Sequence, residues 1–256
     1  MIGIHNPKVK LAVSLTMRKY RERHGLLLLE GERLIRQSLS FGARLAYVLA
    51  ERERLSDAMR QELEAKGIEV LPVGAEVIRK IAQTQTPQGV VAVAYAAMED
   101  AVDLAAAETL IVLDRIQDPG NLGTILRAAA AVGVSGAILT EGTVDPKNPK
   151  AVRASAGAYF RVPLSTGWKP SELSERLGRW EIRLVAADSR GGLDAFAYDW
   201  RGKWALVMGN EGNGLDPSLK PTHRVFLPMP GGIESLNVGV AASVLLYEAY
   251  RRRRDG

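Results

Sequence analysis

The sequence contains no cysteine and only three histidines among its 256 residues. The lack of cysteine excludes disulfide bonds, zinc–thiolate sites and cysteine nucleophiles. His5, His24 and His223 lie far apart in the chain, which argues against a metal site built from histidine. We therefore expect a protein that requires no metal.

Long apolar runs are also missing, and the N-terminus lacks the apolar segment of a signal peptide. Apolar residues make up 46% of the chain and charged residues 25%, proportions that are ordinary for a globular protein and argue against disorder. We expect a soluble cytoplasmic protein with no membrane partner, built as one large domain or two ordinary ones.

Positive charge is concentrated at one end of the chain. The net charge is +5, and residues 1–25 account for all of the excess, because the rest of the chain holds equal numbers of basic and acidic side chains. The basic residues of this segment, which face Glu22 alone, are Lys8, Lys10, Arg18, Lys19, Arg21 and Arg23. Such a cluster suits a polyanion such as RNA, and its first five members are candidate contacts. A solvated helix face has the same composition, so charge alone leaves both interpretations open.

The hydrophobic pattern divides the chain into two α/β blocks. Residues 99–107 show no strand pattern and a local acidic excess, which predicts a linker between domains at 1–98 and 108–256. After a basic helix, the first block shows strand patterns at 26–29, 45–49, 68–71 and 89–94 and helix patterns at 32–39, 56–66 and 75–81. This alternation predicts a small α/β sandwich.

The second block shows the pattern of a parallel sheet flanked by helices. Strands are predicted at 110–113, 136–139, 183–186, 204–208 and 224–227, with helices at 124–132 and from about Leu236 onward. In such sheets, ligands bind beyond the carboxyl ends of the strands. Loops at those ends are therefore the first places to look for a site.

The loop at 114–124 leads into a helix with an apolar stripe that Gly133 closes. Asn121 is placed to cap this helix. Arg127 falls off the stripe, among small residues that leave its guanidinium room to approach an anion. Taken alone, Arg127 is explained more simply by an exposed ion pair.

Two later loops complete the set. In the loop at 209–215, three glycines permit close backbone approach to a ligand, but their spacing matches neither a dinucleotide-binding nor a Walker loop. Glu211 in this loop needs a partner. In the segment 227–238, Ser235 is a plausible helix cap with Asn237 in the first turn, an arrangement that leaves amide donors free.

Together these loops resemble the three motifs of the SpoU (TrmH) branch of the SPOUT methyltransferases. The matching residues are Asn121-x-Gly123-Thr124-x-x-Arg127-Ala128-Ala129, Val207 to Leu215, Leu227-Pro228-Met229, Ser235 to Val238 and Tyr247-Glu248. The stretch 148–158 is similar to the family's RNA-facing region, so Lys150 and Arg153 are further candidate RNA contacts. Through Asn6-Pro7, Glu30-Gly31 and the stretch 86–89, the first block resembles the L30e-like substrate-binding domain of such enzymes.

The resemblance implies an α/β catalytic domain with a trefoil knot, a homodimer with a shared active site, and S-adenosyl-L-methionine as the cofactor. The residues implied for cofactor binding are Ala187, Gly209, Leu227, Met229 and Leu236. Those implied for catalysis are Asn121, Arg127, Glu211, Ser235 and Asn237. Arg127 would position the ribose phosphate and stabilise the developing alkoxide, Glu211 would orient a neighbouring donor, and the two asparagines would align the ribose and the cofactor.

The activity so implied is methylation of a ribose 2′-hydroxyl in RNA, with large-subunit, 23S-type ribosomal RNA as the expected substrate. Three other readings stay open at this point: a SPOUT enzyme that methylates a base nitrogen, a non-enzymatic RNA-binding protein and, more distantly, a Rossmann-type methyltransferase. Transfer RNA also stays open as a substrate.

Overall fold

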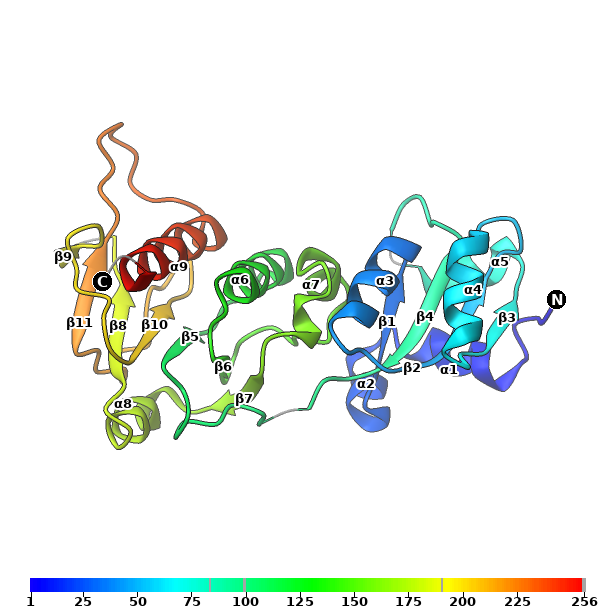
Figure 1. Ribbon diagram of the computed structural model, residues 1–256, viewed down its shortest axis with the longest axis horizontal. Coiled ribbons are helices and arrows are strands. Elements are labelled where there is room, and N and C mark those ends of the chain that lie inside the picture. The colour runs from blue at the N-terminus through cyan, green and yellow to red at the C-terminus, as the bar shows by residue number, and fades with distance from the viewer. Residues whose placement is uncertain (83, 99, 190, 255–256) are drawn as a thin grey trace. The chain divides into compact units, whose positions relative to one another are not determined.

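The computed structural model describes residues 1–82, 84–98, 100–189 and 191–254, which form two compact units (Figure 1). The first unit contains Met1–Ala97 and Asp145–Arg161, and the second contains Met98–Val144 and Val162–Gly256. The sequence predicted two consecutive blocks, whereas the structure places residues 145–161 with the N-terminal unit. Residue 99 of the predicted linker and residues 255–256 of the predicted second domain lie outside the described residues.

The first unit is an α/β structure built on a mixed sheet with strand order β1-β4-β2-β3. Strand β4 is antiparallel to both β1 and β2, and β3 is parallel to β2. Its strands are β1 (Leu26–Glu30), β2 (Leu45–Ala50), β3 (Val70–Pro72) and β4 (Val90–Tyr95). Its helices are α1 (Pro7–Ser14), α2 (Arg18–His24), α3 (Glu32–Ser40), α4 (Asp57–Ala65), α5 (Ala75–Ile81), α7 (Pro149–Ala154) and the 3-10 helix η1 (Ala158–Phe160). The predicted elements of this block are therefore present, with ends shifted by one or two residues.

The basic N-terminal segment forms two helices where the sequence predicted one. Asn6 caps α1 by accepting a hydrogen bond from the backbone N–H of Lys8 at 2.9 Å, and Pro7 occupies the first turn. Gly25 ends α2 in the left-handed conformation, at φ 60°. The side chain of Arg21, on α2, is buried in the interior of the unit.

Arg21 is only 3% exposed, so its predicted contact with RNA is wrong. Its Nη2 lies 2.7 Å from Oδ2 of Asp145, and its Nη1 donates to the carbonyl oxygens of Leu15 and Thr16. A buried guanidinium requires such partners, because removing an ion from water without compensation is costly. Arg21 therefore anchors the segment 145–161 to the first unit.

The rest of that segment packs closely on α3 and β1. Gly157 adopts φ +84°, and a Cβ at this position would lie 3.2 Å from the backbone nitrogen of Ser38. Nη1 of Arg153 lies 3.9 Å from Oε2 of Glu30 on β1. A larger residue at position 157 would push this segment away from α3.

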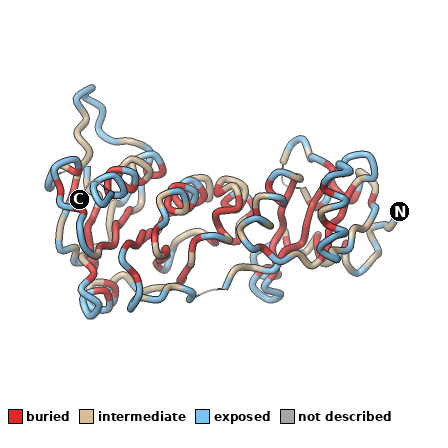
Figure 2. Tube along the Cα trace, viewed as in Figure 1, coloured by how far each residue is buried: buried red, intermediate tan, exposed pale blue. Residues whose placement is uncertain are grey.

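The second unit contains a parallel sheet with strand order β7-β6-β5-β10-β8-β11-β9. Its strands are β5 (Thr109–Leu113), β6 (Gly136–Thr140), β7 (Leu164–Trp168), β8 (Arg183–Ala187), β9 (Leu193–Asp194), β10 (Trp204–Met208) and β11 (His223–Phe226). Its helices are α6 (Pro119–Val132), α8 (Pro170–Gly178) and α9 (Val238–Arg254), and α6 packs along α9. Every residue of β5, β6 and β10 is buried, as expected for the centre of a parallel sheet (Figure 2).

The structure confirms the predicted parallel α/β architecture and adds β7, α8 and β9, which the sequence analysis did not predict. Residues 100–107 form neither helix nor strand, and Val102 and Leu104 pack against the core of the second unit. No helix in the described ranges is long and apolar enough to cross a membrane. The trefoil knot stays a prediction.

Replacing Arg21 with methionine should destabilise the first unit by about 3–5 kcal/mol, because the carboxylate of Asp145 would remain buried without its partner. The matched control is Arg18→Met, which removes an exposed ion pair with Glu22 and should cost no more than about 1 kcal/mol. Urea unfolding followed by circular dichroism measures both. Equal losses in the two variants would contradict the anchoring role of Arg21.

Candidate active site

The central pair of the second sheet, β5 and β10, lies where the order of connections reverses. From β5 the chain moves outward through β6 and β7, then returns to the other side of β5 to form β8 and β10. Loops leave the carboxyl ends of neighbouring strands in opposite directions at such a point and open a crevice. A cavity of about 870 Å³ lies on the β10 side of this point, at the carboxyl ends of β8, β10 and β11, and is lined by residues within 187–189, 208–219, 224–229 and 234–245.

All five residues predicted to bind a cofactor line this cavity. They are Ala187, Gly209, Leu227, Met229 and Leu236, and they come from the end of β8, the loop after β10 and the segment after β11. The volume falls in the range of sites for small molecules and cofactors. The structure thus brings together residues that the sequence separates by up to about fifty positions.

The loop after β10 has a tightly specified backbone. Asn210 and Gly214 exchange backbone hydrogen bonds, and Oδ1 of Asn210 accepts from the N–H groups of Gly212 and Asn213, both at 3.0 Å. A Cβ at Gly209 would lie 2.9 Å from the carbonyl carbon of Gly214, and Gly214 itself adopts φ +67°. A side chain is excluded at Gly209 by the loop backbone, and the conformation of Gly214 favours glycine, which explains the glycine-rich character of the loop.

Three of the predicted catalytic residues form a continuous hydrogen-bonded chain. Nδ2 of Asn121 donates to Oε1 of Glu211 at 2.6 Å, and Nδ2 of Asn237 donates to Oδ1 of Asn121 at 3.0 Å. Oδ1 of Asn237 then accepts from the backbone N–H groups of Gly239 and Val240 at the start of α9. The chain therefore joins the three motif loops, and each amide has its oxygen and nitrogen in a defined place.

This arrangement corrects both predicted helix caps. Helix α6 begins at Pro119, and its cap is Asp118, whose Oδ1 accepts from the backbone N–H of Asn121 at 2.9 Å. Helix α9 begins at Val238 and is capped by Asn237 instead of Ser235. Because Asp118 performs the capping, the side chain of Asn121 is left to join Glu211 and Asn237.

Arg127 and Ser235 are exposed. Arg127 lies on α6 after Asn121 and makes no hydrogen bond or ion pair with any residue in the described part of the chain, so the exposed ion pair that could explain it is not formed there. Ser235 lines the cavity together with Glu211 and Asn237, whereas Arg127 and Asn121 do not. Asn121 reaches the cavity wall through its two hydrogen bonds, and Arg127 remains a separate exposed cation.

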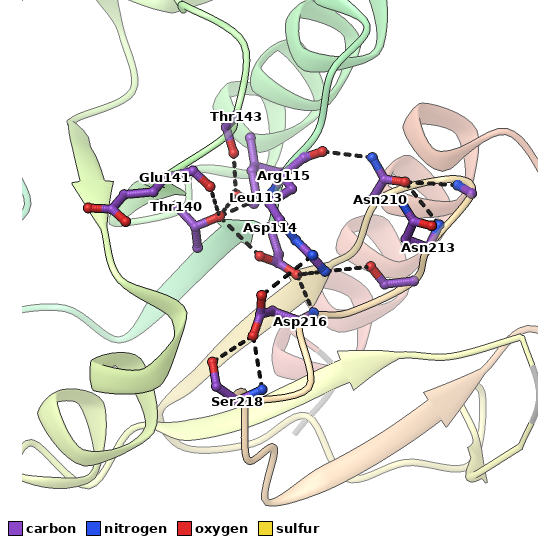
Figure 3. A network of polar contacts seen from close by, with 12 residues as sticks. Leu113, Asp114, Arg115, Thr140, Glu141, Thr143, Asn210, Asn213, Asp216 and Ser218 are labelled. Carbon is purple, nitrogen blue, oxygen red and sulfur yellow. Dashed lines mark hydrogen bonds and ion pairs between the residues drawn. The ribbon is translucent and has the colours of Figure 1, made fainter.

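A second polar network, which was not predicted from the sequence, holds the loop after β10 against the end of β5 (Figure 3). Asp114 is fully buried at the end of β5, where Oδ1 accepts from Oγ1 of Thr140 at 3.0 Å and Oδ2 from the backbone N–H of Asp216 at 2.7 Å. The Ser218 hydroxyl and amide, with Arg115 nearby, hold the pKa of the Asp216 carboxyl below its usual value. The available signal was a charged pair, Asp114-Arg115, placed directly after an apolar strand.

Comparison with known proteins agrees with the geometry. Residues 108–247 match the model of the SpoU rRNA Methylase family, and residues 6–92 match the MRM3-like substrate binding domain. The chain belongs to the SpoU rRNA methylase family.

Its relatives in this family span nearly the whole chain. It is 32% identical over 94% of its length to the 23S rRNA (guanosine(2553)-2′-O)-methyltransferase RlmP of Bacillus subtilis, of which it covers 95%. It is 31% identical over 93% of its length to the 23S rRNA (uridine(2479)-2′-O)-methyltransferase of Streptomyces viridochromogenes, with 87% of that protein covered. The crystal structure of the SpoU methyltransferase AviRb from Streptomyces viridochromogenes, in complex with AdoMet, superposes with a TM-score of 0.87 at 29% identity, covering 98% of this chain and 100% of that one.

Within this SpoU-family chain, most of the candidate RNA contacts lie at the surface of the first unit. Lys10, Arg18, Lys19 and Lys150 are exposed, and Lys8 and Arg153 are half-buried. Ion pairs engage three of them: Lys8 with Glu69, Arg18 with Glu22 at 2.6 Å, and Arg153 with Glu30. Arg21, in contrast, is buried in the interior of the unit.

Proposed function

We propose that this chain is an S-adenosylmethionine-dependent methyltransferase that methylates a ribose 2′-hydroxyl in RNA, with 23S-type ribosomal RNA as its substrate. The observation that carries the proposal is the hydrogen-bonded chain from Glu211 through Asn121 to Asn237 at the rim of the cavity. The named activities of the relatives from Bacillus subtilis and Streptomyces viridochromogenes support the same reaction and substrate class.

The cavity suits a ligand that combines a nucleoside with an amino acid. Leu215, Leu227 and Leu245 supply apolar wall, and Gly209 also lines the cavity. When bound, S-adenosylmethionine supplies a methyl carbon activated by its positively charged sulfur. Ala187, Gly209, Leu227, Met229 and Leu236 would hold it.

The protein's own residues then have to orient the ribose hydroxyl and stabilise the charge that develops on its oxygen. The ribose oxygen must approach the methyl carbon from the side opposite the sulfur and must lose its proton, so orientation is the main contribution. Asn121 and Asn237 are fixed by their mutual hydrogen bond and by Glu211, and they would align the ribose with the methyl donor. Ser235, exposed at the cavity, would donate to the bound ligand.

Arg127 would bind the phosphate next to the target ribose and stabilise the negative charge that develops on its oxygen. Its exposure, without a partner in the described part of the chain, leaves the guanidinium available for this contact. A guanidinium is a poor general base, so we assign Arg127 binding and charge stabilisation instead of proton removal.

Arg127→Ala should lower turnover by roughly 10²-fold or more at saturating RNA, the scale of losing one electrostatic stabiliser, and should leave the affinity for S-adenosylmethionine within about twofold. Transfer of a labelled methyl group into ribosomal RNA, scored as resistance of the neighbouring phosphodiester bond to alkali, measures the reaction. Arg179→Ala, which removes an exposed arginine of the same unit, is the control. Near-normal turnover in Arg127→Ala would refute its role. If the phosphodiester bond next to the labelled nucleotide is cleaved by alkali, the methyl group is on a base and not on the ribose 2′-oxygen.

We also propose that the enzyme acts as a homodimer through α9. The residues at 240, 244, 247 and 250 fall along one stripe of this helix, and Val240 and Tyr247 are 47% and 53% exposed. Exposed apolar stripes of this kind suit a twofold contact between identical chains. Leu245, by contrast, is buried and lines the cavity, so it contributes to the interior of its own subunit.

The wild-type chain should therefore sediment as a dimer at micromolar concentration. Replacing Val240 and Tyr247 together with glutamate should give a folded monomer with little activity, because like charges would face each other across the twofold axis. Analytical ultracentrifugation and the methyl-transfer assay test this pair of outcomes. A fully active monomer would rule out a shared site.

The N-terminal unit would supply much of the RNA affinity. Replacing Lys10, Arg18 and Lys19 with glutamine should reduce the slope of log affinity against log salt by roughly two units, since each lost phosphate contact removes about 0.7 to 0.9. The matched control replaces Arg52, Arg60 and Lys66, three exposed cations of the same unit. Fluorescence titrations over a range of salt concentrations measure the slopes. If both triple variants change the slope equally, the N-terminal helices provide only general positive charge.

A further inference from the structure

Arg115 combines an unfavourable backbone with a dense set of contacts. It is the second residue after β5 and adopts φ 55°, a left-handed conformation that residues with a Cβ rarely occupy. Backbone strain of this kind persists only where surrounding contacts enforce it, and it gathers at functional sites. The backbone N–H of Arg115 donates to Oγ1 of Thr140, and most of its other contacts are with the loop after β10.

The guanidinium of Arg115 holds one end of that loop. Its Nη2 donates to the carbonyl oxygen of Gly214 at 3.3 Å and lies 3.4 Å from Oδ2 of Asp114, and its Nη1 lies 3.4 Å from Oδ2 of Asp216. The carbonyl oxygen of Arg115 accepts from Nδ2 of Asn210 at 3.0 Å (Figure 3). One residue therefore contacts the loop at positions 210, 214 and 216.

Asp114 fixes the position of the Arg115 guanidinium. Its carboxylate is fully buried, and it accepts from Oγ1 of Thr140 on β6 and from the backbone N–H of Asp216. A buried carboxylate surrounded by donors has little freedom to move, because each displacement would leave it without a partner. The guanidinium is thus held between an immobile anion and the loop.

The loop is held at a second point by the proposed catalytic residues. Glu211, within the same loop, accepts from Nδ2 of Asn121 at 2.6 Å. Asn121 lies six residues after Arg115 in the chain, near the start of α6. The loop from Gly209 to Asp216 lines the cavity. Two residues that follow β5 hold it: Asn121 contacts Glu211, and Arg115 contacts Gly214 and Asp216.

We infer that Arg115 is a positioning residue for methyl transfer: together with Asp114 it holds the loop 209–216 in the conformation that forms the wall of the methyl-donor cavity and places Glu211 against Asn121. The inference rests on the proposed function of the cavity. Arg115 acts through the loop, and neither the donor nor the RNA has to touch it.

Two substitutions separate positioning from folding. Arg115→Met removes the guanidinium and keeps a side chain of comparable length. Arg115→Gly also removes it but relieves the positive φ, so comparing the stability of the two variants separates backbone strain from the loss of the guanidinium. Arg201→Met is the matched control, because it removes an exposed arginine of the same unit whose ion pair with Asp199 lies away from the cavity.

Isothermal titration of the full-length chain with S-adenosylmethionine, without RNA, should show affinity weakened by about tenfold or more in both Arg115 variants, the scale of losing charge-assisted hydrogen bonds. Arg201→Met should stay within twofold of the wild type. Arg115→Lys should fall between, because an ammonium cannot reproduce the planar fork that reaches Gly214 and both carboxylates. Affinity for RNA should be unchanged in all variants.

Hydrogen exchange supplies a readout that does not depend on the bound donor. The amides of Gly212 and Asn213, which donate to Oδ1 of Asn210, should exchange faster in both Arg115 variants, while the amides of β5 and β10 keep their protection. Unchanged exchange in the loop, or donor affinity within twofold of the wild type in both variants, would overturn the role of Arg115. A wild-type chain that fails to bind S-adenosylmethionine would instead refute the proposed function, and the exchange experiment would still decide whether Arg115 holds the loop.

Discussion

The pairing of β5 with β10 is the contact on which the site depends. The two strands are nearly a hundred positions apart in the sequence, and their parallel alignment brings Asp114 level with the loop that follows Met208. Because both strands are buried along their whole length, neither can slide without exposing apolar side chains to water. Sheet register thereby determines whether the side chains of two distant loops can hydrogen-bond at all.

Helix α6, which follows β5, places Asn121 in a fixed position relative to the paired strands. It starts five residues after Asp114 and packs along α9, so Asn121 stands between the loop after β10 and the start of α9. Glu211 and Asn237 come from two different loops, and Asn121 links their side chains. An amide is suited to this position because it donates to a carboxylate and accepts from a second amide at once.

Much of the architecture could be predicted from the sequence because its central strands are short, wholly apolar runs followed by polar loops. The motif residues were also found, since the resemblance rests on them. The helix caps were not, because Asp118 and Asn121, or Ser235 and Asn237, are equally good caps by residue type and only backbone geometry decides between them. The burial of Arg21 was missed for a different reason: its partner Asp145 is 124 positions away, and a basic residue in a basic segment carries no sign of such a partner.

The anchoring of residues 145–161 on the first unit has a consequence for biosynthesis. A chain emerging from the ribosome completes the sequence of the four-stranded sheet by residue 97, well before Asp145 and α7 have been made. Until then Arg21 is a cation at an interior position without its carboxylate, and the surface of β1 and α3 that receives α7 and Gly157 faces water. The N-terminal unit therefore cannot complete its folding before the other unit is partly made. Residues 145–161 are translated only after β5, α6 and β6 of the second unit.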